Sequence, residues 1–298
     1  MSNTALYTTI YPGEELYLKP WFDSVAAQTD NDFDIVIGLD AFTPEQVFEH
    51  VGQEFEARFV SADAGATPVE VRTKPIELII NEYDQVVFTD SDDVLFPQRV
   101  ERAKKQLQHC DLTACALEII NEDGSAAGQL FPLKENAALE ELLPFANVFG
   151  LSNTAYRCEL LRRVLPVPCE CVMMDWFMAT KAWFLGAEIY RDSAPMMSYR
   201  QHGSNTARVL APFTEKQIIN GFRLLKLHYS LLSDHVLADY PDKMELFRGA
   251  DTRLDIFIDS MKDEAKLNTY LISLNKLEEE HIWWSWLAHP QLEEIWKN

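Results

Sequence analysis

The amino-acid sequence predicts an α/β protein with a Rossmann-like, mostly parallel sheet flanked by helices and with a helical C-terminal extension. Two observations support this fold class. Short apolar runs that favour β-strands alternate with helical segments through the N-terminal half, which is the pattern of a parallel sheet covered on both faces. After about Pro212 the strand-like runs stop, and long, charged helical segments follow. We therefore expect one domain over residues 1–210 and a helical extension over residues 211–298.

Four short apolar runs predict the strands of the sheet: Leu6–Tyr11, Phe33–Leu39, Phe55–Val60 and Gln85–Thr89. Ligands of parallel sheets bind beyond the carboxyl ends of the strands. Tyr11, Asp40 and the aspartates from Asp90 onward stand at such ends. These residues are therefore the first candidates for a binding site.

The helices are predicted from apolar spacing and from start signals. Glu14–Ala27 and Val71–Glu82 are helix candidates in the N-terminal half. Thr43-Pro44-Glu45 predicts a helix start with Thr43 as the cap and Pro44 at the first helical position. The C-terminal extension is predicted to be helical over Glu215–Leu232, Met244–Leu274 and Leu277–Trp296, with a break at Pro290.

Composition limits the classes of function. A hydrophobic fraction of 47% predicts a packed core rather than disorder. The formal net charge of −21 argues against nucleic acid as a partner, because such a chain repels phosphate backbones. A phosphorylated metabolite can still bind if a metal ion or a few local arginines neutralise it.

Neither a membrane span nor a leader is expected. No apolar stretch approaches the roughly 20 residues that a spanning helix needs, and the first residues lack a basic flank and an apolar run. The expected location is the cytoplasm, with the inner face of the membrane as the alternative. The five cysteines include no CxxC pair, so ordinary reduced thiols are favoured over a metal motif at Cys169-Glu170-Cys171.

The central motif is Asp90-Ser91-Asp92-Asp93, which follows the apolar run ending at Phe88 and Thr89. Three carboxylates in four positions repel one another unless a cation is present. Hard oxygen ligands of this kind suit Mg²⁺ or Mn²⁺, which bridge carboxylates to substrate phosphates. The alternative interpretation is that Asp92 or Asp93 caps a helix beginning near Pro97.

Six pieces of the sequence, in order, resemble family 2 glycosyltransferases, which have the GT-A fold, over roughly residues 5 to 206. The sequence is similar especially to bacterial enzymes that build surface polysaccharides, including rhamnosyltransferase-like members. The pieces are Thr8–Tyr11, Asp23–Thr29, Phe33–Ile37, Asp90–Asp93, Met174–Trp176 with Ile189-Tyr190, and Ser198–Asn205.

The resemblance implies a role for each matching residue. It implies a nucleotide pocket that involves Thr9, Tyr11, Glu14, Asp40 and Arg72. It implies that Asp90 faces the ribose or the metal and that Asp92 binds the metal. It further implies that Asp175 is the catalytic base, that Trp176 beside it contacts the acceptor, that Arg200 binds the diphosphate, and that His202 binds the metal or a phosphate oxygen.

Structural alternatives stay open for several of these residues. Thr9 and Tyr11 can be ordinary strand residues, Arg72 a surface arginine beside Glu70, and Asp175 a helix cap. A lone histidine such as His202 is often structural. The chain also departs from many relatives, which carry paired aspartates where this chain has Asp40-Ala41 and an asparagine where it has Thr73. The nucleotide base and the sugar therefore stay open.

The expected function is metal-assisted transfer of a sugar, with inversion, from a nucleoside-diphosphate sugar to an acceptor hydroxyl. UDP- or dTDP-linked donors and saccharide or lipid-linked saccharide acceptors are expected, as in polysaccharide or glycoconjugate biosynthesis. Inversion is favoured because nothing in the sequence nominates a protein nucleophile. The alternatives are a sugar-nucleotide nucleotidyltransferase, for which Tyr11–Glu15 is too glycine-poor, and a non-catalytic nucleotide-sugar-binding protein.

The tryptophans near the C-terminus allow two interpretations. Trp283, Trp284, Trp286 and Trp296 can contact a membrane surface or pack against protein, including a second subunit of a homodimer. Glu278–Glu280 and Glu293-Glu294 would be repelled by an anionic leaflet, so at most peripheral membrane contact is expected. Packing against protein is the favoured interpretation.

Overall fold

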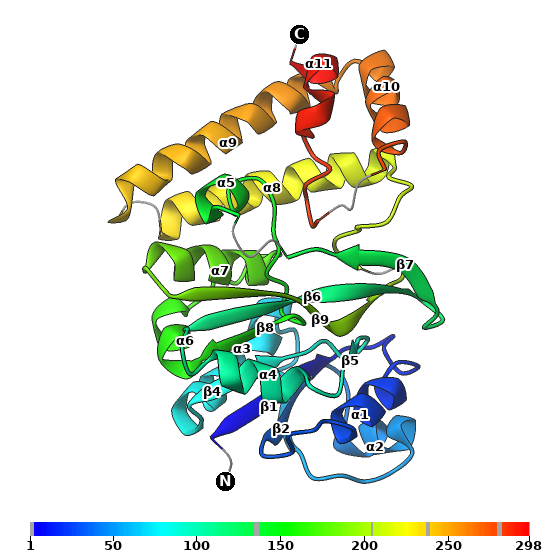
Figure 1. Ribbon diagram of the computed structural model, residues 1–298, viewed down its shortest axis with the longest axis vertical. Helices are drawn as coiled ribbons and strands as arrows, with labels where there is room; N and C mark the ends of the chain where they lie inside the picture. The colour runs from blue at the N-terminus through cyan, green and yellow to red at the C-terminus, as the bar shows by residue number, and fades with distance from the viewer. Residues whose placement is uncertain (1–2, 134–136, 204, 237–238, 279–281, 298) are drawn as a thin grey trace. The chain divides into compact units, whose positions relative to one another are not determined.

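The computed structural model describes residues 3–133, 137–203, 205–236, 239–278 and 282–297 (Figure 1). The chain divides into two compact units. The first consists of residues 1–135, 149–170 and 174–200, and the second of residues 136–148, 171–173 and 201–298. The main segment of the second unit thus begins at residue 201, ten residues before the expected start at 211, and two earlier segments also belong to this unit.

The first unit is built on one sheet in the order β3-β2-β1-β4-β8-β6-β9-β5, with β7 paired to β6. The four predicted strands are present as β1 (Thr4–Ile10), β2 (Asp34–Leu39), β3 (Arg58–Ser61) and β4 (Gln85–Phe88). They pair in parallel, β1 lying between β2 and β4. Every residue of β1 is buried, as expected for the central strand of a sheet covered on both faces.

The sheet continues beyond β4 with antiparallel strands that the sequence pattern did not predict. They are β5 (Val94–Leu95), β6 (Leu112–Asn121), β7 (Ala126–Phe131), β8 (Thr154–Arg157) and β9 (Ile189–Gln201). β8 pairs antiparallel to both β4 and β6. The α/β class is confirmed, and its parallel part is the half that the sequence predicted.

The helices of the first unit begin where local signals favour it. They are α1 (Leu18–Ala26), α2 (Pro44–Val51), α3 (Pro68–Glu82), α4 (Arg99–Gln106), α6 (Cys158–Val164) and α7 (Met174–Phe184). Thr43 caps α2 and Pro44 occupies its first turn, as predicted, and Thr43 and Gln46 form a reciprocal capping box. α3 starts earlier than expected because Thr67 forms the same kind of box.

Strand β2 approaches helix α3 closely at Gly38. A Cβ atom at this position would lie 3.1 Å from Pro75 Cγ and 3.3 Å from Tyr7 Oη. Only a residue without a side chain fits there without displacing its neighbours. This contact fixes α3, and with it Arg72, against the carboxyl end of the parallel strands.

The second unit is mainly helical (Figure 1). Its helices are α5 (Leu139–Leu142), α8 (Glu215–His235), α9 (Pro241–Ser260), α10 (Glu264–Leu274), the 3₁₀ turn η2 (Pro290–Leu292) and α11 (Glu293–Trp296). The single helix predicted over Met244–Leu274 is two helices. The break follows from Asp263, whose carboxylate accepts hydrogen bonds from the amides of Ala265 and Lys266 and so starts α10.

The helix predicted over Leu277–Trp296 is wrong for the described residues. Residues 282–289 are irregular, and Trp284 and Ala288 have positive φ angles of 71° and 47°. Only η2 and the short α11 follow, while residues 279–281, with Glu279 and Glu280, lie outside the described residues. A helix is excluded here because two non-glycine residues adopt left-handed backbone.

The four C-terminal tryptophans are buried in protein, as predicted. Their exposed fractions are 5% or less. Trp286 stacks on Phe213 with ring centroids 5.4 Å apart, and its indole nitrogen donates to the Arg208 carbonyl at 3.1 Å. Among the described residues, no helix combines the length and the apolar character that crossing a bilayer requires.

Candidate functional site

The strand order places a topological switch point at the carboxyl ends of β1 and β4. From β1 the chain runs outward through β2 and β3 on one side, and β4 adds on the other side. Open α/β sheets bind ligands in the crevice at such a point. Tyr11 directly follows β1, and the Asp90–Asp93 turn follows β4. The two candidate motifs therefore lie at one place in the fold.

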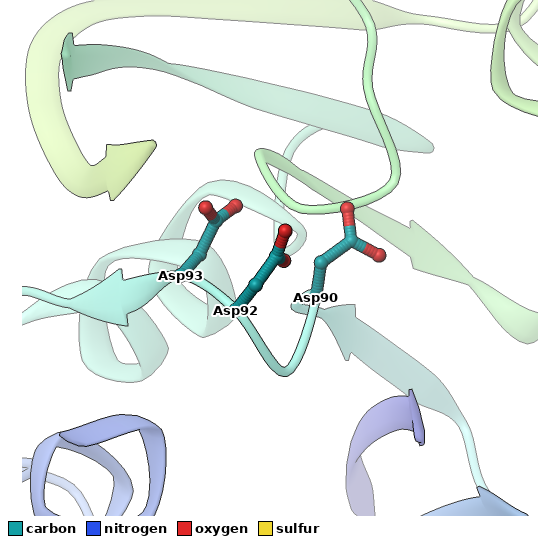
Figure 2. A group of neighbouring side chains, drawn as sticks. All are labelled: Asp90, Asp92 and Asp93. Carbon is teal, nitrogen blue, oxygen red and sulfur yellow. The ribbon is translucent and has the colours of Figure 1, made fainter. Parts of the chain in front are cut away.

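The Asp90–Asp93 turn brings three carboxylates together, projecting from the loop between β4 and β5 (Figure 2). One oxygen from each of Asp90, Asp92 and Asp93 lies within 4.8 Å of the others. Asp93 is fully buried and Asp92 is 8% exposed. The described residues thus contain an all-oxygen cluster of the size and charge that hard divalent cations take.

Two of these carboxyl groups have pKa values above their ordinary values. Burial, and then the charge of Asp92, raises the pKa of Asp90 from 3.8 to about 7, against the opposing influence of Arg72. Burial, and then the charges of Asp92 and Asp90, raises the pKa of Asp93 well above its ordinary value. A cation among them would relieve both causes.

Asp93 also holds the local fold together. Its carboxylate accepts a hydrogen bond from the Ser152 hydroxyl and a second from the Arg200 backbone amide at 2.8 Å. It does not cap a helix, because α4 begins at Arg99 and no side chain caps it. Asp93 therefore fastens the acidic turn to β9, a role that the sequence did not reveal.

Arg200 completes this connection through its side chain. Nε donates to the Asp92 carbonyl at 2.7 Å, and Nη1 donates to the Glu122 carbonyl at 3.0 Å. The guanidinium carbon lies 4.8 Å from the centroid of the Tyr17 ring. The structure thus shows Arg200 holding the acidic turn and the β6–β7 loop, while direct contact with a diphosphate stays a prediction.

Arg72 and Tyr11 form the second part of the site. The Arg72 guanidinium carbon lies 5.3 Å from the centroid of the Tyr11 ring. Arg72 Nε and the Tyr11 hydroxyl are both buried and have no hydrogen-bond partner among the described residues. Buried polar atoms are seldom left unsatisfied, so these two atoms point to a polar ligand.

The surface interpretation of Arg72 is not what the structure shows. Glu70, the residue expected beside it, accepts from the Thr67 amide at 2.7 Å and so serves its own helix start. The Arg72 backbone carbonyl accepts from the Tyr7 hydroxyl at 2.9 Å. Thr9 is part of the same network, because its hydroxyl lies 2.8 Å from that of Tyr7.

Glu14 lies at the edge of the acidic turn. Its carboxylate accepts from the Tyr11 amide at 3.1 Å and contacts the Ser91 hydroxyl. Burial, and then the charge of Asp92, raises the pKa of Glu14 from 4.5 to about 7. The Ser91 hydroxyl also lies 3.1 Å from the Thr9 carbonyl. Ser91 therefore joins the residues after β1 to those after β4.

The charges of Asp40 and Asp175 act on residues of this site, and that of Asp40 acts on Tyr11. The Asp40 amide donates to the Ile10 carbonyl at 3.0 Å, which places Asp40 beside the end of β1. The charge of Asp175 contributes to the raised pKa values of both Asp90 and Arg72. Asp175 lies inside the first turn of α7 rather than at its cap. Both residues therefore stay candidates.

Trp176 and His202 are the remaining predicted site residues. Trp176 is 0% exposed, so it offers an acceptor no surface in this structure, and its burial gives it a packing role in the core. His202 belongs to the second unit, and its amide donates to the Asn205 side chain at 2.5 Å. Metal binding by His202 stays a prediction. The sequence missed Tyr7, Ser91 and Ser152, whose types carry no signal without the fold.

Known structures share this fold. Residues 1–349 of TarS from S. aureus in complex with UDP-GlcNAc superimpose with a TM-score of 0.57 at 17% identity, over 84% of this chain and 72% of that one. The mannosyltransferase PcManGT from Pyrobaculum calidifontis, in complex with GDP-Man and Mn²⁺, gives a TM-score of 0.53 at 13% identity, over 99% and 85%. This chain therefore shares the fold of these two proteins. No protein-family model matches the sequence, and neither does the sequence of any curated protein.

Proposed function

We propose that this protein is a glycosyltransferase that moves a sugar from a nucleoside-diphosphate sugar to an acceptor hydroxyl. The observation that carries the proposal is the site at the switch point, where the Asp90–Asp93 cluster adjoins an arginine and a tyrosine with unsatisfied buried polar atoms. A nucleotide sugar bound to a divalent cation matches both halves of this site. The fold shared with proteins in complex with UDP-GlcNAc or with GDP-Man and Mn²⁺ supports it.

The acidic cluster fits a metal ion on the chemistry of its donors. Asp90 and Asp92 are proposed as ligands of Mn²⁺ or Mg²⁺, because their carboxylate oxygens lie together and no hydrogen bond lowers the pKa of Asp90. His202 is proposed as a further ligand. When bound, the cation supplies Lewis-acid stabilisation of the charge that develops on the departing diphosphate.

Side chains of the protein bind the nucleotide and accept the proton. Arg72 Nε and the Tyr11 hydroxyl are proposed to hydrogen-bond the nucleotide, with Thr9, Glu14 and Asp40 lining its pocket. Asp175 accepts the proton of the acceptor hydroxyl as this oxygen attacks the anomeric carbon. The charge of Asp175 acts on both Asp90 and Arg72, which supports this role.

The proposal includes the stereochemistry of the transfer, the donor and the acceptor. A direct attack from the face opposite the leaving group inverts the anomeric centre. The resemblance to bacterial family 2 enzymes favours UDP- or dTDP-linked donors, a saccharide or lipid-linked saccharide acceptor, and a role in polysaccharide or glycoconjugate biosynthesis. A location in the cytoplasm or at the inner membrane face is part of the proposal. A homodimer through the C-terminal helices is proposed on the sequence pattern alone.

The test is incubation of the full chain with a panel of UDP-, dTDP- and GDP-sugars and Mn²⁺ or Mg²⁺. Release of a nucleoside diphosphate that depends on the cation is the expected result, and the Asp92→Asn variant is the control. A parallel incubation contains a nucleoside triphosphate and a sugar phosphate, and release of pyrophosphate in it would instead indicate a nucleotidyltransferase. Donor binding without any turnover across acceptors would indicate a binding protein.

A further inference from the structure

A second candidate binding site lies within the helical unit, among α5, α8, α9 and the irregular segment before η2. The pocket has a volume of about 340 Å³. Small-molecule pockets range from roughly 300 to 1,000 Å³, so this one suits a small ligand. Its walls are mainly apolar and include Leu142, Phe145, Leu225, Tyr229 and Leu254.

The pocket contains one cationic side chain, that of Arg253 on α9. The Arg253 guanidinium carbon lies 5.4 Å from the centroid of the Phe145 ring and 5.1 Å from that of the Trp296 ring. Nη2 donates to the Ala288 carbonyl at 2.7 Å. These contacts hold the guanidinium in place beside the apolar walls.

Arg253 lacks the anionic partner that a partly buried guanidinium usually has. No carboxylate among the described residues lies within ion-pair distance of it, and its buried Nε donates to no acceptor there. Glu293, which feels the charge of Arg253, is instead paired with Lys297 at 2.8 Å. In a chain of net charge −21, this unpaired arginine is not explained by a shortage of acidic side chains.

We infer that this pocket binds a small amphiphilic anion, with its carboxylate or phosphate at Arg253 and its apolar body against Phe145, Leu225 and Leu254. An oxygen of the anion accepts the charge-assisted hydrogen bond for which Arg253 Nε has no acceptor among the described residues. The apolar body removes the side chains of the pocket wall from water. This site consists of residues of the second unit alone, so it does not depend on the proposed glycosyl transfer.

The first experiment compares four probes for binding to the full chain by calorimetry. Octanoate and octyl phosphate have both an anionic head and an apolar body, while octanol lacks the charge and inorganic phosphate lacks the apolar body. Binding of the two amphiphilic anions, and of neither other probe, is the expected result. Equal binding of octanol would refute the role of Arg253, binding of inorganic phosphate would refute the role of the apolar wall, and no binding of any probe would refute the site.

Variants then locate the site. Arg253→Met keeps an unbranched side chain of similar length but removes the charge, and it should weaken octanoate binding roughly 10-fold or more, as expected for loss of a hydrogen bond to a charged group. The matched control is Arg248→Met on the same helix, because Arg248 is exposed and does not line the pocket. Unchanged octanoate binding in Arg253→Met would overturn the assignment.

A third variant keeps the test valid if Arg253→Met does not fold. Glu141 lines the pocket and is exposed, so Glu141→Gln should leave the fold intact. Removal of this negative charge should strengthen octanoate binding about twofold at low salt and leave octanol binding unchanged. Weaker octanoate binding in Glu141→Gln would contradict an anion in this pocket.

Discussion

At the scale of single residues, the acidic motif contains side chains with different tasks. Asp93 is fully buried and accepts from Ser152 and from the Arg200 amide, so its oxygens already serve the fold. Asp90 and Asp92 project from the same turn as Asp93, and no hydrogen bond lowers the pKa of Asp90. The sequence alone could not separate these tasks, because the bond from Arg200 to Asp93 joins residues 107 positions apart.

The first prediction separates the two tasks by matched substitutions. Asp92→Asn should abolish turnover and metal-dependent nucleotide binding, because it removes a proposed ligand of the cation. Asp93→Asn should lower the free energy of unfolding by about 1–3 kcal/mol, because it weakens two buried hydrogen bonds. Denaturant unfolding and nucleotide titration with and without Mn²⁺ measure both effects. Full activity of Asp92→Asn, or of the wild type in EDTA, would contradict the metal assignment.

The second prediction concerns Asp175 as the proposed base. Asp175→Asn should keep donor binding and thermal stability while the transfer rate falls by roughly 10²–10⁴-fold, the usual effect of losing a general base. Single-turnover kinetics and donor titration separate the two quantities. A collapse of stability together with a normal rate per folded molecule would show that Asp175 acts in the fold of α7 instead.

At the scale of helices and strands, the sequence predicted those elements whose signals are local. Thr43 and Pro44 set the start of α2 through contacts with neighbouring residues, and the structure confirms both. The four parallel strands were also predicted, and with them the strand ends that carry Tyr11 and Asp90. The segment before η2 was not, because Trp284 and Ala288 adopt positive φ. Distant packing partners such as Phe213 fix this segment, and no pattern within it reveals them.

The third prediction tests that packing with two glycines in helices. In α8, a Cβ atom at Gly221 would lie 2.7 Å from Trp286 Cη2 and 2.8 Å from Leu287 Cδ1, whereas in α9 one at Gly249 would meet nothing within 4 Å. Gly249→Ala should raise the free energy of unfolding by about 0.5–1 kcal/mol, the usual gain in a helix. Gly221→Ala should lower it by about 1–3 kcal/mol through overpacking.

Thermal or denaturant unfolding of both variants, followed through tryptophan fluorescence, measures this difference. Gly221→Ala should also change the emission of the wild-type-like folded state, because Trp286 must move. Equal stabilisation by the two substitutions would show that the C-terminal segment does not pack on α8 in solution.

At the scale of the whole molecule, the protein combines a net charge of −21 with a site that concentrates further buried carboxyl groups. Glu14 and Asp90 both have pKa values raised to about 7, from 4.5 and 3.8, and burial is the main cause for each. In the folded protein these groups hold protons that the unfolded chain has already released between about pH 4 and pH 7. Folding therefore becomes less favourable as the pH rises through this window.

The last prediction is a pH dependence of stability that a metal ion reverses. Without metal, the free energy of unfolding should fall between pH 4.5 and about 7.5. The Glu14 carboxyl should account for about 3 kcal/mol of the decrease, since its pKa is raised from 4.5 to about 7 and one pKa unit corresponds to about 1.4 kcal/mol. General repulsion among the acidic side chains acts in the same direction. Glu14→Gln isolates the local part, because it should flatten the curve while changing the net charge by only one. Mn²⁺ should stabilise the protein increasingly as the pH rises, because the cation binds the deprotonated carboxylates. A curve that is equally steep in Glu14→Gln, or a stabilisation by Mn²⁺ that does not depend on pH, would show that the carboxyl groups at the strand ends are not coupled to folding in this way.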